Sequence, residues 1–230
     1  MPFWPGSSDA RFADRRDAGR QLAAKLAHLR GADVLVLGLP RGGVEVAYEV
    51  AKALDAPLDV LVARKLGAPQ QPELAIGAIA PGASVLRSDI IDALGIAPHE
   101  IEAIAERERR RAAELETRLR HGRRPEDPSG RTAIVVDDGL ATGATATAAV
   151  RSVRTRGPAR VVLAVPVAAP ESVRDLRREV DEVVTVIAPH DMRAVGLWYE
   201  LFPQVSDEEV EAMLDERAAA RGTPGQPARR

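Results

Sequence analysis

Two adjacent carboxylates, Asp137 and Asp138, follow directly after the apolar run 134–136. A loop of small and hydroxyl residues comes next, and an alanine-rich helical pattern begins within it. A strand over the apolar run would place the carboxylates at its carboxyl end, where open α/β sheets bind ligands. The loop would turn backbone N–H groups at a helix N-terminus toward a phosphate, with a glycine permitting close approach and two threonines as donors. Carboxylates suit sugar hydroxyls or a metal ion instead, so the pattern predicts a site for a phosphorylated ribose.

Two other interpretations of this segment are weaker. An ordinary strand–turn–helix with an Asp-Gly turn needs neither two carboxylates nor two threonines. A nucleotide-binding P-loop requires a lysine after its last glycine, and Ala144 follows Gly143 here. The phosphate-plus-sugar interpretation is therefore preferred.

A second candidate anion site is the turn Leu39-Pro40-Arg41-Gly42-Gly43, which follows an earlier apolar run and opens a helical pattern. Its glycines allow backbone N–H groups to face an anion closely, and Arg41 adds a fixed charge suited to phosphate oxygens. Taken alone, the same residues fit a tight turn with an exposed arginine better.

The elements that would position these residues alternate between apolar runs and helical spacings, which predicts parallel strands joined by right-handed crossovers. The fold class is therefore α/β, a Rossmann-like doubly wound parallel sheet of about five strands. Helices are expected over 10–30, 44–54, 142–156 and 171–180. Core strands are expected over 34–39, 58–63, 131–137, 160–165 and 182–187.

The remaining segments surround this core. Gly, Pro and Gln without periodicity predict a mobile loop over 64–82, in which 75–80 and 83–86 could pair as a hairpin. A helical insertion is expected over 87–128, with one long Glu/Arg-rich helix over 98–121 whose mixed charges indicate a solvated or subunit-contact face. Ser206, with Glu209 three positions later, predicts a helix start. A single domain over 1–216 with a loose leader and a disordered tail over 217–230 is expected.

Composition limits the classes of partner. The chain of 230 residues has a net charge of -2, which gives no global attraction to nucleic acid or anionic lipid. It has no cysteine, so disulfides and thiolate metal sites are excluded. Neither a long apolar span nor the basic-then-apolar pattern of a signal peptide is present, so we expect a cytoplasmic protein without a membrane or nucleic-acid partner.

Residues 134–145 resemble the phosphoribosyl pyrophosphate (PRPP) signature of the type I phosphoribosyltransferases, in which a hydrophobic strand, two acidic residues and a small Thr/Gly loop follow in register. The resemblance implies that Asp137 and Asp138 hold the ribose hydroxyls, directly or through Mg²⁺ and its waters. It also implies a cis peptide bond between Pro40 and Arg41. The implied 5-phosphate loop is Ala141, Thr142, Gly143, Ala144 and Thr145, and the implied pyrophosphate loop is Pro40, Arg41, Gly42 and Gly43.

The same resemblance implies further roles. Lys65 and the 64–74 segment occupy the place of the family's flexible catalytic loop, so Lys65 would reach the leaving pyrophosphate; the alternative is a lysine facing solvent. Trp198 and Tyr199, near Phe202, fall where the family has a hood over the base, here 188–216; the alternative is a packing cluster. The implied reaction is Mg²⁺-dependent transfer from PRPP to a nitrogen nucleophile, a nucleobase by resemblance, in a homodimer.

One departure leaves the activity open. Several purine-type members carry an acid in the phosphate loop that acts as a base, and Ala141 stands at that position here. Glu73, His190 and Asp191 are the remaining candidates for a general base, and each is equally a solvated loop residue. The alternative function is a non-catalytic module that senses PRPP or a nucleotide. A PRPP synthase is disfavoured by the chain length and by the lack of an evident ATP site.

Overall fold

Five parallel strands form the central sheet of the computed structural model, which describes residues 11–222. Their order across the sheet is β2-β1-β6-β7-β8. All five residues of β1 are buried, as expected for a parallel strand that is covered on both faces. The expected leader, 1–9, lies outside the described residues. The strands are β1 (Val34–Gly38), β2 (Leu58–Val60), β6 (Thr132–Val136), β7 (Arg160–Val167) and β8 (Glu182–Ile187).

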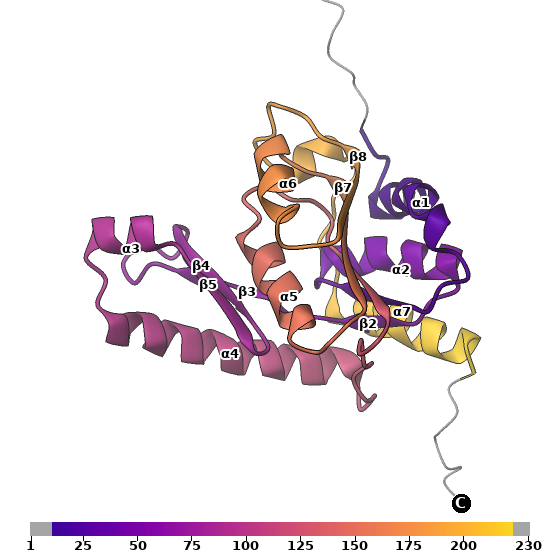
Figure 1. Cartoon of the computed structure of the whole chain (residues 1–230), viewed down its shortest axis with the longest axis horizontal. Coiled ribbons are helices and arrows are strands. Elements are labelled where there is room, and N and C mark those ends of the chain that lie inside the picture. Colours follow the sequence, from indigo (N-terminus) through magenta and orange to yellow (C-terminus); the bar gives the residue numbers. More distant parts are fainter. Residues whose placement is uncertain (1–10, 223–230) are drawn as a thin grey trace, which may run out of the picture.

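Helices cover both faces of this sheet, as Figure 1 shows. Each face has its own buried apolar cluster, one built around Leu22 and Val46 and the other around Leu35 and Leu163. The prediction of a doubly wound α/β sheet of five strands is therefore confirmed. No helix within 11–222 combines the length and the apolarity that crossing a membrane requires. The first face carries α1 (Arg15–Lys25), η1 (Ala27–Leu29), α2 (Gly42–Leu54) and α7 (Asp207–Ala220), and the second carries α5 (Ala144–Arg154) and α6 (Pro170–Leu176).

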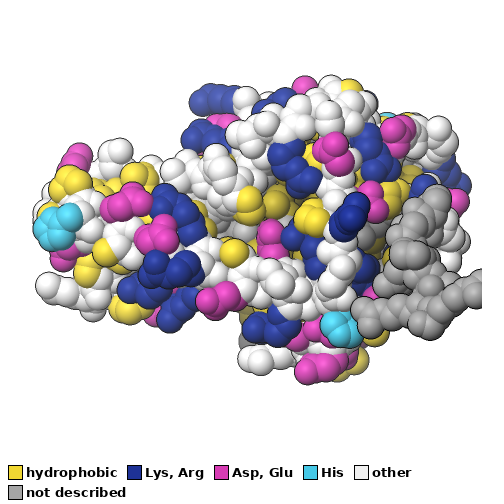
Figure 2. Space-filling view, turned by 90° about the horizontal axis from the view of Figure 1, so that it is seen from below, with side chains coloured by type: hydrophobic (Ala, Val, Ile, Leu, Met, Phe, Trp, Pro, Cys, Tyr) yellow, Lys and Arg dark blue, Asp and Glu magenta, His cyan; other side chains and the backbone are white. Residues whose placement is uncertain are grey.

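Residues 64–120 project from the sheet as an arm, seen at the left of Figure 1. Leu66, Ile76, Ile79 and Ile104 form the centre of a separate small core within it. In Figure 2 the arm is the left-hand lobe, where side chains of both charges lie beside hydrophobic ones. The arm consists of β3 (Arg64–Gly67), β4 (Ala75–Ala80), β5 (Ala83–Leu86), α3 (Ser88–Leu94) and α4 (Pro98–Arg120).

The prediction of a mobile loop over 64–82 is wrong for residues 64–67, whereas residues 68–74 do form a turn and loop. Residues 64–67 are a strand that pairs antiparallel with β4, and β4 pairs with β5 in the hairpin that the sequence predicts. The turn that follows β3 is closed by Ala68 N–H donating to the Leu74 carbonyl at 2.9 Å. A four-residue strand that contains a lysine and a glycine has no recognisable period in the sequence. Its pairing with β4 and the burial of Leu66 define it in the structure.

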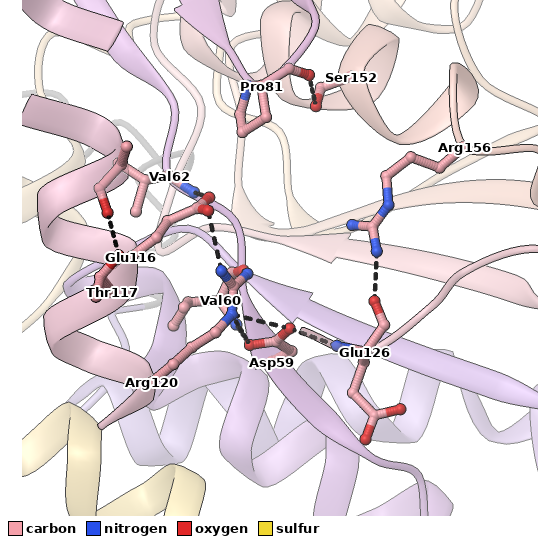
Figure 3. A network of polar contacts seen from close by, with 11 residues as sticks. Asp59, Val60, Val62, Pro81, Glu116, Thr117, Arg120, Glu126, Ser152 and Arg156 are labelled. Carbon is pink, nitrogen blue, oxygen red and sulfur yellow. Dashed lines mark hydrogen bonds and ion pairs between the residues drawn. The ribbon is translucent and has the colours of Figure 1, made fainter. Parts of the chain in front are cut away.

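A buried charge network fixes the base of the arm to the edge of the central sheet (Figure 3). Arg120 Nε donates to both carboxylate oxygens of Asp59 at 2.9 and 3.2 Å, and Nη2 donates to the Val60 carbonyl at 2.7 Å. Asp59 also accepts the Glu126 N–H at 2.9 Å, while Glu116 pairs with Arg120 Nη1 at 3.0 Å. Each buried charge in this network thus has a partner, as a low-dielectric environment requires.

The C-terminal helix α7 begins as the sequence predicts and ends later. Ser206 Oγ accepts the Glu209 N–H at 3.1 Å, and a Glu209 carboxylate oxygen accepts the Ser206 N–H at 2.7 Å, which is a complete capping box. The helix continues to Ala220, so residues 217–220 are not the start of a disordered tail. Arg217 is buried and donates to the Ala56 carbonyl at 3.0 Å, a long-range contact that composition does not reveal. Residues 223–230 lie outside the described residues.

Candidate functional site

The two sequence motifs meet at the carboxyl ends of β1 and β6. These strands are neighbours in register, with Gly38 opposite Val136, and Leu39 N–H extends the ladder to the Val136 carbonyl at 2.8 Å. From β1 the chain crosses to β2 on one side, whereas from β6 it crosses to β7 on the other. Such a switch in direction opens a crevice beyond the strand ends, which is the usual ligand site of an open α/β sheet.

Gly42 and Gly43 bring the backbone of one motif against the carboxylates of the other. A Cβ on Gly42 would lie 2.0 Å from Asp138 Oδ2, and one on Gly43 would lie 2.8 Å from the Asp137 Cα. Real side chains cannot approach so closely, so both positions require glycine for steric reasons. The turn is therefore packed against the acidic pair, as a single binding site requires.

The loop after the acidic pair leads into the N-terminus of α5. Gly143 caps that helix with φ at +77°, a conformation that favours glycine. Within 11–222, the N–H groups of Ala141, Thr142 and Gly143 donate to no protein acceptor, and Ala144 and Thr145 begin the helix, where N–H groups lack intrahelical partners. These N–H groups and the helix dipole make the loop suitable for an anion.

The two carboxylates are partly buried. Burial raises the pKa of Asp137 well above its ordinary value, and the neighbouring charge of Asp138 raises it further. Burial also raises the pKa of Asp138, and the guanidinium of Arg15 opposes that rise. The Asp138 N–H donates to Asp137 Oδ1 at 2.9 Å, which orients the first carboxylate. The partly buried pair can accept hydrogen bonds from hydroxyl groups.

Arg15, in the first turn of α1, is a site residue that the sequence reasoning missed. Its Nε lies 2.8 Å from Asp138 Oδ2, and its side chain is only 6% exposed. Its position shares a helix face with Ala18 and Leu22, which are both fully buried. An arginine on an otherwise apolar helix face predicts a buried anionic partner, and this signal was available in the sequence.

Arg41 follows a cis peptide bond from Pro40, as the resemblance implies. Its Nε donates to Asp207 Oδ1 at 2.5 Å, and Arg118 from α4 donates to the other oxygen of the same carboxylate at 2.7 Å. The hydrogen bond from Arg41 is the main cause of the lowered pKa of Asp207. A shallow cavity of about 320 Å³ lies beside Arg41, lined also by residues 204–208.

Lys65 lies in the arm, on β3. Its ammonium contacts the Glu73 carboxylate at 3.3 Å and the Glu73 carbonyl at 3.2 Å. In the part of the chain that the structure describes, it makes no hydrogen bond or ion pair with the acidic pair or with the Arg41 turn. The structure therefore does not bring Lys65 into contact with the two motifs.

The aromatic residues of the expected hood differ in exposure. Tyr199 is buried between Phe12 and Phe202, with ring centroids 5.3 and 4.9 Å away, and its hydroxyl donates to the Asp138 carbonyl at 2.5 Å. Burial raises the pKa of Tyr199. Trp198, which ends the 3-10 helix η2 (Val195–Trp198), is partly exposed. Tyr199 thus fits the packing alternative, and Trp198, which is packed against the same cluster of Phe12 and Tyr199, keeps part of its surface exposed.

The donor set for a metal ion is small. No group of three or more acidic or histidine side chains that could hold a metal exists among residues 11–222. Asp137 and Asp138 are two carboxylates, and one oxygen of Asp138 is already bound to Arg15. Mg²⁺ is commonly held by one or two carboxylates together with substrate phosphate oxygens, and the pair fits that kind of site.

The three candidates for a general base all lie in exposed positions. Glu73 is 95% exposed at its side chain and pairs with Lys65, while His190 and Asp191 are exposed in the segment after β8. Ala141 is exposed at the start of the phosphate loop. The general base therefore stays unassigned.

A family model described as "Phosphoribosyl transferase domain" matches residues 13–200. A protein of Mycobacterium tuberculosis named "Putative phosphoribosyl transferase" is 51% identical over 208 residues, which are 89% of this chain and 46% of that protein. The chain thus spans about half the length of these curated relatives.

Two further similarities differ in extent. A crystal structure of a protein from Thermus thermophilus superposes with a TM-score of 0.75 at 46% identity, covering 90% of this chain and 98% of that one. A uracil phosphoribosyltransferase of Lactobacillus delbrueckii is 37% identical over 83 residues, which are 36% of this chain and 39% of that enzyme.

Proposed function

The chain belongs to the phosphoribosyl transferase domain family, and on that premise we propose that it transfers the 5-phosphoribosyl group of PRPP to a nitrogen nucleophile with Mg²⁺ as cofactor. The observation that carries the proposal is the meeting of three groups beyond β1 and β6. These are the acidic pair, the Gly42–Gly43 backbone and the 141–145 loop. Each group suits a different part of one ligand.

The 141–145 loop would bind the 5-phosphate. Its unpaired N–H groups, the hydroxyls of Thr142 and Thr145 and the positive end of α5 all favour an anion at this position. A phosphate anchored here fixes one end of the sugar. The ribose ring then extends toward Asp137 and Asp138, which precede the loop in the chain.

The acidic pair would hold the ribose hydroxyls during the reaction. The lone pair of the acceptor nitrogen forms a bond to ribose C1, while the bond from C1 to pyrophosphate breaks and its electrons leave with the pyrophosphate. Positive charge develops on the ribose as these bonds exchange. The partly buried carboxylates of Asp137 and Asp138 would favour that charge electrostatically.

The Arg41 turn would bind the pyrophosphate. Gly42 and Gly43 pack against the acidic pair, and Arg41, the residue before them in the turn, supplies a guanidinium suited to phosphate oxygens. Mg²⁺, when bound with PRPP, would neutralise phosphate oxygens beside the carboxylates. We also propose that Lys65 reaches the pyrophosphate as it leaves. Unchanged turnover of a Lys65→Ala variant would refute that role.

The acceptor that we propose is a nucleobase. The uracil enzyme of Lactobacillus delbrueckii, similar over about a third of this chain, acts on such a base. Trp198 is partly exposed in the segment that we propose as the hood, 188–216, and its ring could stack on a planar heterocycle. Replacement of Trp198 by alanine should raise KM for the base without changing the affinity for PRPP.

A second candidate function is a non-catalytic module that senses PRPP or a nucleotide on the same fold. Ala141 favours it, because an acid that could serve as a base is missing from the phosphate loop. Both functions use the same binding site. They differ only in whether pyrophosphate is released when a base is added.

We further propose that residues 1–216, together with the rest of α7 to Ala220, act as one domain and that the protein is a homodimer. Leu86 and Leu94 are exposed on the arm, and exposed apolar side chains would suit a subunit contact. A solution mass of twice 24.6 kDa would support the dimer, and a mass of one chain would refute it.

Isothermal titration with PRPP, with and without Mg²⁺, tests the site directly. We expect saturable binding that depends on Mg²⁺ and is lost when Asp137 and Asp138 are both replaced by asparagine. Circular dichroism of that variant would establish that it is folded. Absence of binding to the wild type would refute the proposal. Pyrophosphate release with a panel of purine and pyrimidine bases then separates the enzyme from the sensing module.

A further inference from the structure

Arg15 connects three separate parts of the site. Besides its bond to Asp138, its Nη1 donates to the Pro203 carbonyl at 2.6 Å, and its guanidinium carbon lies 3.7 Å from the centre of the Phe202 ring. A Cβ on Gly42 would lie 2.7 Å from its Nε. The acidic pair, the Arg41 turn and the segment 202–203 therefore all contact this one side chain.

The position of Arg15 is unfavourable without these contacts. Burial removes a charged group from water, and the first turn of α1 is the positive end of the helix dipole, which disfavours a cation. The adjacent Arg16 has a different environment, since it is more exposed and pairs with Glu45 and Glu49 on α2. Arg16 therefore forms the ion pairs between α1 and α2. The ion pair of Arg15 is instead with Asp138, in the candidate site.

The geometry of the ion pair leaves part of Asp138 available. Arg15 contacts Oδ2, while no protein donor contacts Oδ1 among the described residues. The Asp138 carbonyl is also held, by the Tyr199 hydroxyl at 2.5 Å. The Asp138 carboxylate is therefore held by Arg15 of α1, and its backbone carbonyl by Tyr199 of the C-terminal segment, with one carboxylate oxygen left to accept a hydrogen bond.

We propose that Arg15 is a positioning residue that orients the Asp138 carboxylate toward the ribose hydroxyls of PRPP and links it to the segment 199–203. This inference rests on the proposed function. Because Arg15 would act through Asp138, its removal should weaken binding of the sugar ligand only while Asp138 keeps its carboxylate. An arginine that merely held α1 in place would show no such dependence.

A double-mutant cycle with Arg15→Gln and Asp138→Asn tests the inference by titration with PRPP and Mg²⁺. We expect Arg15→Gln to weaken PRPP binding roughly tenfold, a loss within the usual range for coupled neighbours. The double variant should bind no more weakly than Asp138→Asn alone. Arg16→Gln is the matched control, because it removes an ion-pairing arginine of the same helix and should leave the affinity for PRPP unchanged.

Arg15→Lys guards against a variant that fails to fold. Lysine keeps the charge, but one ammonium cannot reproduce the planar donor geometry that reaches Asp138 and Pro203 together, so an intermediate loss of PRPP affinity is expected. Equal PRPP affinities of the wild type, Arg15→Lys and Arg15→Gln would overturn the inference about Arg15 but not the proposed function. Additive losses in the cycle would also overturn it. A wild type that does not bind PRPP would overturn the proposed function and this inference together.

Discussion

At the scale of single residues, the site depends on close approach between backbone and carboxylate. Gly42 and Gly43 let the Arg41 turn contact Asp137 and Asp138 at distances that no side chain permits. The same packing partly buries the carboxylates, and burial raises the pKa of both. Steric fit and electrostatics therefore have a common origin here, and each can be tested by one substitution.

Gly42→Ala should abolish PRPP binding. The added methyl group would overlap Asp138 Oδ2, so either the turn or the carboxylate must move. Gly19→Ala is the control, because its Cβ would lie 2.8 Å from the Val46 carbonyl oxygen at the α1–α2 contact. Both variants should have a lower melting temperature than the wild type. The expected loss in free energy of unfolding is that typical of overpacking, about 1–3 kcal/mol. Titration with PRPP should distinguish them, and retained binding by Gly42→Ala would contradict the prediction.

Asp137→Asn should stabilise the fold at neutral pH. A carboxyl group with a raised pKa binds its proton more tightly when folded, so stability falls as pH rises from the ordinary value, about 3.9, through the raised one. Above that window the charge penalty is complete, and asparagine removes it. We expect the melting temperature of Asp137→Asn at pH 8 to be about 2–4 °C above that of the wild type, equivalent to roughly 1 kcal/mol at this chain length. Below about pH 4 the two proteins should melt at the same temperature.

Asp138→Asn provides the contrast for that measurement. It breaks the ion pair with the buried Arg15, so its melting temperature at pH 8 should fall below that of the wild type. A decrease in both variants would contradict the prediction for Asp137→Asn.

At the scale of elements, the arm is a small substructure with its own core, attached to the edge strand β2. Its core packs β3 and β4 against α4, while the charges of Asp59 and Arg120 fix the end of α4 to β2. Strands β4 and β5 also contact α5, whose N-terminus lies in the 141–145 loop. The arm is therefore joined to the site through a helix that both share.

Arg120→Met should destabilise the protein strongly. Asp59 would remain buried without its cation, and removal of one partner of a buried pair typically lowers the free energy of unfolding by about 3–5 kcal/mol. Arg109→Met is the control on the same helix, because its pairs with Glu102 and Glu106 are solvent-exposed and should contribute less than about 1 kcal/mol. Urea unfolding of both variants measures the difference. Equal midpoints would contradict the assigned role of the network.

At the scale of the whole molecule, one carboxylate joins three distant segments. Asp207 at the start of α7 binds Arg41 from the turn after β1 and Arg118 from α4. Its lowered pKa reflects stabilisation that is present above the ordinary pKa and is lost as pH falls through the lowered value. The contact links the candidate site, the arm and the C-terminal helix.

Asp207→Asn should weaken PRPP binding by several-fold through loss of orientation of Arg41, with little change in stability, since exposed arginine pairs contribute about 0–1 kcal/mol. Glu208→Gln, on the same exposed turn, should leave the affinity unchanged. Tighter binding by Asp207→Asn would show instead that Asp207 competes with the pyrophosphate for Arg41.

Local pattern was enough to predict much of this molecule. Apolar runs and helical periods predicted the five strands and the doubly wound sheet, because a parallel strand buried on both faces must be apolar throughout. The acidic pair and both loops were also recognisable, since their residue types and spacing act locally. The capping box of Ser206 and Glu209 was predicted for the same reason.

Contacts between residues far apart in sequence were decided only by the tertiary structure. Arg15 and Asp138 are 123 residues apart, Arg41 and Asp207 are 166 apart, and neither pair shares a local pattern. Strand β3 and the end of α7 likewise depend on Leu66 and Arg217 finding buried partners elsewhere in the chain. A sequence determines such pairings through the energy of the complete fold, because burial and charge pairing exist only after distant segments have come together.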